Sequence, residues 1–236
     1  MKQITKAFVV AALGLVMATA AQASFVQLTD SSQLNVTGLA TNPNGTLVSG
    51  YAINLSSGNP NGVMFNGVRF QSGGYGYADM IDGVHLISDP YGPATWSDMS
   101  AYYPIGTRAT PTGTDGDALR TMMEDWSWVQ ALSFAVTPGQ EYTLQVIGSN
   151  PTGNPHGGSE AASIGINGIA EAITRTAGQN WIYTTTFTAS GTTARIDFGA
   201  GNYPSAGAVL LTPVPEPATM SLLALGGLGA LIRRRK

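Results

Sequence analysis

The feature that most constrains this chain is a series of short β-rich segments, separated by glycine, proline and asparagine turns at intervals of roughly ten residues. In several segments apolar residues alternate with polar ones, which is typical of strands that bury one face. The candidate strands are residues 25–28, 34–39, 46–55, 63–70, 129–136, 141–147, 162–166, 169–173, 181–189, 193–198 and 207–212. Many short strands with little helical periodicity predict an all-β fold, an antiparallel β-sandwich of the jelly-roll-like kind.

Turn signals indicate how some of these strands are connected. Pro138 and Gly139 lie between the segments 129–136 and 141–147. Because proline fixes one φ angle of a tight turn and glycine supplies the positive one, we expect a hairpin there. An Asn-Gly pair at 167–168 predicts a second hairpin.

One segment departs from the strand pattern. Residues 115–126 begin with aspartate and carry apolar residues at helical spacing. We expect a short helix or capped turn there, leading into the strand at 129–136.

Charge and cysteine content limit what the domain can do. Residues 24–212 hold five arginines, no lysine and thirteen acidic residues. An acidic surface repels phosphate backbones, so we expect no nucleic-acid partner. The chain has no cysteine, which excludes disulfides, thiolate metal sites and a cysteine nucleophile. With 43% hydrophobic residues the chain has enough apolar surface for one folded domain, which we place at residues 24–213.

Residues 1–23 predict a secretory signal peptide. Lys2 and Lys6 supply a positive start, and an apolar stretch follows at 7–17. The small residues of the expected cleavage site are Ala21, Ala23 and Ser24, with Ser24 the first residue of the mature chain. The alternative is an uncleaved membrane anchor, which the short apolar run and the lack of a following charge disfavour.

The carboxyl-terminal segment, residues 214–236, combines three features in order. Pro215 and Pro217 flank Glu216 and restrict the chain there to extended conformations. Residues 218–232 carry no charge, and as a helix they would span about 22 Å, less than the roughly 30 Å of a hydrocarbon core. The chain ends in the basic cluster Arg233, Arg234, Arg235 and Lys236. Such charges favour the cytoplasmic side, so we expect a hydrophobic helix that tethers the domain transiently outside the membrane.

The Pro-Glu-Pro triplet, the hydrophobic helix and the arginine-rich end resemble the PEP-CTERM sorting signal. The resemblance implies recognition by exosortase, a membrane-embedded cysteine transpeptidase-like enzyme, in exopolysaccharide-making Gram-negative bacteria. It implies export across the inner membrane, a membrane-tethered stage, and delivery to the cell surface or extracellular matrix. The alternative is a plain anchor with two incidental prolines. The resemblance covers about a tenth of the chain and gives no information on the function of the domain at residues 24–213.

The second half of the domain, residues 126–213, resembles galactose-binding-like and malectin-like jelly rolls in the order of its segments. The resemblance is one of pattern: a strand containing PGQEYTLQV, an INGI hairpin, two further strands and a closing apolar strand. Many such domains bind carbohydrate or serve as adhesive modules. That implication is fold analogy alone.

Aromatic residues gather in a glycine- and aspartate-rich region at 73–106, where regular strands are hard to place. Exposed rings beside carboxylates and amides are a common sugar-binding surface, because the C–H faces of sugars stack on them. The candidate glycan-contact residues are Tyr75, Tyr77, Tyr91, Trp96, Tyr102 and Tyr103. The alternative, which we favour, is that these rings pack a long loop onto the sandwich.

Candidate metal and catalytic residues are few. Asp115 and Asp117 offer closely spaced carboxylates, the ligand type that Ca²⁺ prefers, but helix capping explains the same residues. His85 and His156 fit no metal-ligand spacing, and no Gly-x-Ser-x-Gly elbow follows a strand. We therefore expect no enzymatic activity and no cofactor, with Ca²⁺ as the one candidate ion.

Three functional hypotheses remain. The favoured one is an exported, non-enzymatic protein of the cell surface or extracellular matrix, associated with exopolysaccharide. The second is a carbohydrate-binding module that recognises exopolysaccharide through the aromatic loop. The third is a secreted hydrolase that uses a pair of acidic residues.

Overall fold

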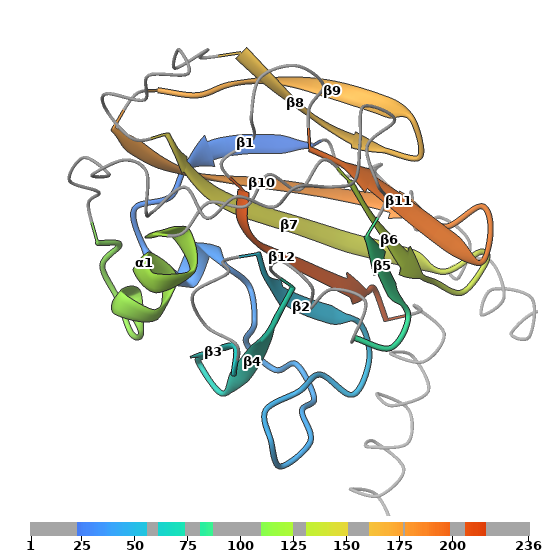
Figure 1. Cartoon of the computed structure of the whole chain (residues 1–236), viewed down its shortest axis with the longest axis horizontal. Helices are drawn as coiled ribbons and strands as arrows, with labels where there is room; N and C mark the ends of the chain where they lie inside the picture. Colours follow the sequence, from blue (N-terminus) through green and yellow to red (C-terminus); the bar gives the residue numbers. More distant parts are fainter. Residues whose placement is uncertain are drawn as a thin grey trace, which may run out of the picture.

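The computed structural model describes residues 23–55, 61–73, 81–86, 110–124, 131–150, 161–176, 178–198 and 206–215. Within them the chain forms a sandwich of two β-sheets, so the all-β prediction is confirmed (Figure 1). The expected signal helix and the expected C-terminal helix lie outside the described residues.

The larger sheet has seven strands in the order β1-β10-β7-β12-β2-β4-β3, and the smaller has five in the order β5-β6-β11-β8-β9. The seven strands are, in chain order, β1 (Ser24–Gln27), β2 (Tyr51–Asn54), β3 (Val63–Phe65), β4 (Val68–Ser72), β7 (Glu141–Asn150), β10 (Gln179–Thr188) and β12 (Ala206–Pro213). The five are β5 (Val84–Leu86), β6 (Ala131–Ala135), β8 (Ala161–Ile166), β9 (Ile169–Thr174) and β11 (Thr193–Asp197). Among the described strand pairs, β2 and β4 are the parallel one, and all the others are antiparallel.

The space between the two sheets is the first hydrophobic core. Every second residue of the central strands points into it, as the two-residue repeat of a strand requires. Leu144 and Val146 enter it from β7, and Phe134 enters it from β6 on the opposite sheet. A hydrogen bond also crosses the sandwich, because the hydroxyl of Tyr183 on β10 donates to the carboxylate of Glu171 on β9 over 2.8 Å.

The other face of the seven-stranded sheet is buried as well, by a layer that we call the cover. The cover consists of residues 28–50, the helix α1 (Gly116–Glu124) and the β3–β4 hairpin, which also forms one edge of the seven-stranded sheet. In Figure 1 α1 and the hairpin lie away from β8 and β9 of the five-stranded sheet. Burial on both faces explains why β12 is a nearly continuous apolar run, AGAVLLTP, instead of an alternating one.

The proposed hairpin at Pro138 and Gly139 is wrong. Strand β6 before the turn belongs to the five-stranded sheet, and β7 after it belongs to the seven-stranded sheet. The turn is therefore a bend between sheets, and it pairs with a second such bend at 189–192. The amide of Gly139 donates to the carbonyl of Ala189, and the amide of Ala189 donates to the carbonyl of Gln140. Turn residues predict a reversal of the chain, but they do not say which strand becomes the hydrogen-bonded neighbour.

Asn-Gly pairs behave as their sequence predicts. The pair at 167–168 has φ angles of 52° and 85° and connects β8 to β9, which confirms the expected hairpin. Asn66 and Gly67, with φ angles of 45° and 80°, make the same kind of turn between β3 and β4. The single strand expected at 63–70 is therefore wrong, because its central Asn-Gly pair turns the chain back.

The amino-terminal part of the cover also departs from expectation. The strand predicted at 34–39 is wrong, and of 46–55 only β2 is a regular strand. A 3₁₀ helix, η1 (Ser31–Gln33), begins this region, because Asp30 and Gln33 form a reciprocal capping box. The apolar side chains of this segment pack onto the sheet from irregular chain.

Candidate functional site: a sorting junction and a surface groove

The carboxyl end of the sandwich passes directly into the Pro-Glu-Pro triplet, at a place that we call the sorting junction (residues 213–215). Pro213 is the last residue of β12 and pairs with Tyr142 of β7. Val214 follows, and both of its backbone groups are bonded. Its amide donates to the carbonyl of Glu141 over 2.8 Å, and its carbonyl accepts from the side-chain amide of Gln140 over 2.7 Å. The chain is thus held against the domain up to the residue before Pro215.

Pro215 itself is exposed. Glu216 and Pro217, the uncharged segment 218–232, and the basic cluster Arg233 to Lys236 lie outside the described residues. The sorting motif therefore begins at the surface of the domain, with no described linker between the last strand and its first proline.

The expected signal-peptide cleavage site falls at the start of the fold. Ala21 lies outside the described residues, and Ala23 packs partly buried against the first core. Ser24, the expected first residue of the mature chain, begins β1 and pairs with Thr184 of β10. Cleavage after Ala23 would leave β1 complete, which is compatible with the prediction but does not test it.

The six candidate glycan-contact residues, Tyr75, Tyr77, Tyr91, Trp96, Tyr102 and Tyr103, lie outside the described residues. Their role stays a prediction. Strand β5 is a regular strand within this glycine-rich region, and sequence reasoning missed it because a three-residue strand has too few residues to show alternation.

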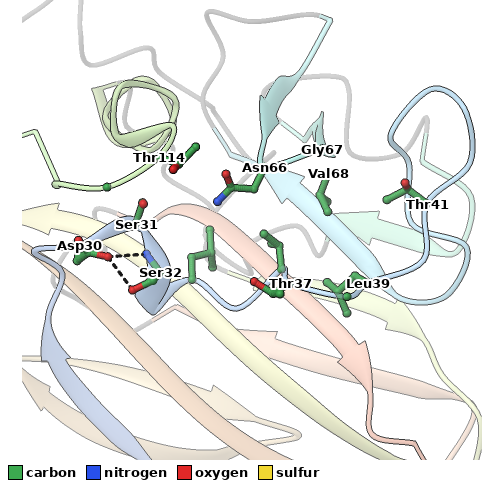
Figure 2. Close-up of a pocket in the computed structure, with 14 residues that line it drawn as sticks. Asp30, Ser31, Ser32, Thr37, Leu39, Thr41, Asn66, Gly67, Val68 and Thr114 are labelled. Atoms are coloured by element: carbon green, nitrogen blue, oxygen red, sulfur yellow. Dashed lines mark hydrogen bonds between the residues drawn. The ribbon is translucent and has the colours of Figure 1, made fainter.

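A groove of about 630 Å³ opens on the cover, where three separate segments meet (Figure 2). Its floor is apolar and includes Leu34, Val36 and Val68. Polar side chains stand around the floor, and within the described structure those of Thr37, Thr41, Asn66 and Thr114 make no hydrogen bond to the protein. A volume of this size is within the range of small-ligand sites.

Hydrogen bonds between the three segments fix the shape of the groove. Asp30 and Thr112 join the first and third segments, since the Thr112 hydroxyl donates to the Asp30 carboxylate over 2.7 Å. The backbone amides of Ser31 and Thr112 also cross between these segments. The second segment is attached because the amide of Asn66 donates to the carboxylate of Asp115 over 2.8 Å.

Asp30 is the only charged residue among the described residues that line the groove. Its carboxylate accepts from the amide and the hydroxyl of Ser32 (Figure 2). It also accepts from the hydroxyl of Thr112. These hydrogen bonds, those from Ser32 first, lower the pKa of Asp30 below its ordinary value. A groove with one carboxylate and no basic side chain in its described lining suits a neutral ligand better than an anionic one.

The structure gives Asp115 and Asp117 separate local roles. Asp115, at a φ of 58°, precedes α1, and its carbonyl accepts the first helical hydrogen bonds from Ala118 and Leu119. Asp117 lies in the first turn of α1, where a negative charge stabilises the helix dipole. Across the described ranges, no three histidine, aspartate or glutamate side chains are close enough together to hold a metal ion. Calcium binding stays an untested prediction.

Comparison with protein-family models gives one decisive result. Residues 213–236 match the model described as the PEP-CTERM protein-sorting motif. The chain carries a PEP-CTERM motif. The motif marks the protein for export and for sorting by exosortase, a membrane enzyme, and it begins at Pro213, where β12 ends. In the described ranges, no helix has both the length and the apolar composition needed to cross a bilayer.

Solved structures of Bacteroides uniformis beta-glucuronidase match this chain at low similarity. A calcium-binding mutant of beta-glucuronidase 2 has 11% identity and a TM-score of 0.41. The same enzyme bound covalently to cyclophellitol-6-carboxylate aziridine has 12% identity and a TM-score of 0.38. A further crystal structure has 12% identity and a TM-score of 0.39. Each match covers 70% of this chain but only 18% of the enzyme chain. Comparison with curated proteins gives no match.

Sequence reasoning missed two parts of these sites. The bond from Gln140 to Val214 joins residues far apart in the sequence, so no local pattern indicates it. The groove combines three loops whose polar residues are common in turns. The Asn-Gly pair at 66–67 is the one local signal that could have placed a turn at the groove.

Proposed function

We propose that this chain is an exported, non-enzymatic protein of the cell surface or extracellular matrix, sorted by an exosortase-type enzyme and associated with exopolysaccharide. The observation that carries the proposal is the PEP-CTERM motif at residues 213–236, attached directly to the last strand of a folded domain. The expected signal peptide at 1–23 supplies export, and residues 218–232 with the basic cluster supply a transient membrane tether.

Alanine substitution of the triplet tests this proposal. Pro215→Ala, Glu216→Ala and Pro217→Ala together leave β12 and Val214 unchanged, so the domain should fold as in the wild type. In cells that make an exosortase, we expect wild-type protein in the surface and extracellular fractions and the triple variant retained in the inner membrane. Equal distribution of the two proteins over these fractions would contradict the proposal.

A second candidate function is binding of a neutral glycan, and the groove on the cover favours it. A sugar offers hydroxyls to polar side chains that make no hydrogen bond within the described structure, and apolar C–H groups to an aliphatic floor. The groove thereby provides an alternative to the aromatic loop as the contact surface. Exopolysaccharide is then the ligand class that we propose, because the resemblance to PEP-CTERM sorting signals implies bacteria that make it.

Glycan binding can be tested at both surfaces at once. The probe is an array of neutral and uronic-acid-containing oligosaccharides, applied to the chain from residue 24 to residue 215. Asn66→Gly removes the side-chain amide but keeps the positive φ that the turn requires, and Thr37→Ala removes one hydroxyl. If the groove is the site, these variants lose neutral-glycan binding at an unchanged Tm, whereas Tyr91→Ala and Trp96→Ala keep it. A blank array would contradict this second function and leave the sorting proposal unaffected.

A further inference from the structure

The end of the sandwich beside the sorting junction is built from two bends that hold each other in place. We call this surface the junction end (residues 137–140 and 189–192). Two backbone hydrogen bonds join the bends, and a third runs from Val136, just before the first bend, to Thr192 over 2.9 Å. The hydroxyl of Tyr142 also accepts from the amide of Thr137 over 3.0 Å and ties the first bend to the core. The junction end is thus a fixed surface of the domain.

The sorting motif leaves the domain at this surface. Gln140 belongs to the junction end and holds the carbonyl of Val214, so Pro215 emerges beside it. Only four peptide units separate Val214 from residue 218, where the uncharged segment begins, and they reach at most about 14 Å when fully extended. A membrane enzyme that engages the Pro-Glu-Pro triplet must therefore come close to the junction end.

The junction end itself carries no charge. Its eight residues include no charged side chain. Thr137, Pro138, Ser190 and Thr192 are exposed. At Gly191 a Cβ atom would meet nothing within 4 Å, so packing within the described protein does not require a small residue there. A surface without charged side chains allows a partner to approach closely without burying a charge, which is costly.

We propose that the junction end is the surface with which this protein docks on its membrane-embedded sorting enzyme. The inference rests on the proposed function and adds a second contact to the tail. The enzyme holds the triplet, and the domain end lies against the enzyme because the bonds of Val214 keep the start of the triplet beside the junction end. The folded domain then contributes to recognition by the enzyme, in addition to the tail.

Placing charges on the junction end tests the proposal in the full chain. Ser190→Glu with Thr192→Glu adds two carboxylates at exposed positions whose side chains make no hydrogen bond within the described structure. The matched control is Thr174→Glu with Thr176→Glu, also exposed and also two residues apart. Thr176 lies at the opposite end of β10, because its carbonyl accepts from Gln179, the first residue of that strand. Ten residues of strand separate the two sites, about 30 Å.

The measurement is the fraction of chain that has lost its tail in cells making an exosortase, read from intact mass. We expect the junction-end variant to be processed several-fold more slowly than the wild type, because docking must desolvate the new charges. The control variant should be processed at the wild-type rate, and Tm values of the purified domains should agree. Insertion of ten Gly/Ser residues between Val214 and Pro215 should restore processing of the junction-end variant, since the tail then no longer needs the domain nearby.

The outcomes separate the two proposals. Wild-type processing of the junction-end variant without the linker would overturn the docking inference and leave the proposed function standing. Slow processing that the linker does not restore would also overturn it, because the defect would not depend on how close the domain lies. No processing of the wild-type chain itself would contradict the proposed function, and the docking inference with it.

Discussion

One face of the seven-stranded sheet packs against a second sheet, whereas the other packs against irregular chain, a short hairpin and one helix. Both faces are buried along most of the central strands β7 and β12. The inter-sheet core is held by regularly alternating side chains. The cover depends in addition on single polar contacts, such as the amide of Gln145 and the carboxylates of Asp30 and Asp115.

This contrast between the two layers indicates which parts of the fold tolerate substitution. The apolar positions of an alternating core tolerate another apolar residue of similar size, because packing there depends on volume and not on one particular atom. A cover of loops requires particular side chains at particular turns, and it is the layer in which the groove opens. The cover is therefore the layer whose surface can be specialised.

Removing one phenylalanine from each layer is the strongest test of whether the two layers fold together. Phe134 in the inter-sheet core and Phe65 in the cover are both fully buried. Phe134→Ala and Phe65→Ala should each lower the free energy of unfolding by about 3–5 kcal/mol. Because β7 and β12 carry side chains into both cores, we expect one cooperative transition with an unchanged m-value in urea. A two-step transition in Phe65→Ala alone would show that the cover unfolds by itself.

Adding a side-chain atom at the contact between α1 and β12 should have the next largest effect on the free energy of unfolding. A Cβ atom at Gly207 on β12 would overlap the carbonyl of Met122 in α1. Gly207→Ala should therefore displace α1 and cost about 2–3 kcal/mol. Gly191→Ala is the control, because its Cβ atom would meet nothing, and it should change stability by less than about 0.5 kcal/mol. Equal midpoints in urea for the two variants would contradict the close packing of α1.

Gln145 connects the sheet to the cover, and its removal should loosen the cover alone. Its side chain accepts from the amide of Asn35 and donates to the carbonyl of Gln33 and the hydroxyl of Thr184. Gln145→Met keeps most of the volume but leaves the two backbone groups unpaired, at a cost of about 1–2 kcal/mol. Hydrogen exchange should become faster at residues 33–36 and stay unchanged in β10. Faster exchange throughout both sheets would argue against a separate role for this contact.

The smallest expected effect is a pH dependence at the capping box. Because the pKa of Asp30 is lowered in the folded state, its ionised form adds stability above the ordinary carboxyl value of 3.8. That contribution is lost as the pH falls below this value. In Asp30→Asn it is absent, so the Tm difference between wild type and variant should shrink from pH 6 to pH 3. A constant difference over this range would mean that the carboxylate charge is irrelevant to the cap.

The sequence predicted the regular part of this molecule better than the irregular part. Strands such as β10 and β12 carry long β-rich or apolar runs, and these were located within two residues. The bend at Pro138 was misassigned because hairpins and bends between sheets use the same turn residues. The buried segment at 34–39 resembles a strand in composition, but the capping box at Asp30 and Gln33 and the glycine at 38 direct it along another path.

The candidate sites show the same division. The sorting motif is local, so residues 214–236 disclosed it without any fold. The groove and the bond between Gln140 and Val214 unite distant segments, and no spacing in a single sequence reports such proximity. The structure therefore adds the surface around the motif, whereas the sequence supplies the motif itself.

The most direct test of the central claim is the intact mass of the protein recovered from the surface of cells that make an exosortase. If a membrane enzyme processes the tail of the folded domain, the protein should be recovered as a chain that begins at Ser24 and lacks the basic end, Arg233 to Lys236. Recovery from the surface with the complete tail still attached would contradict the account.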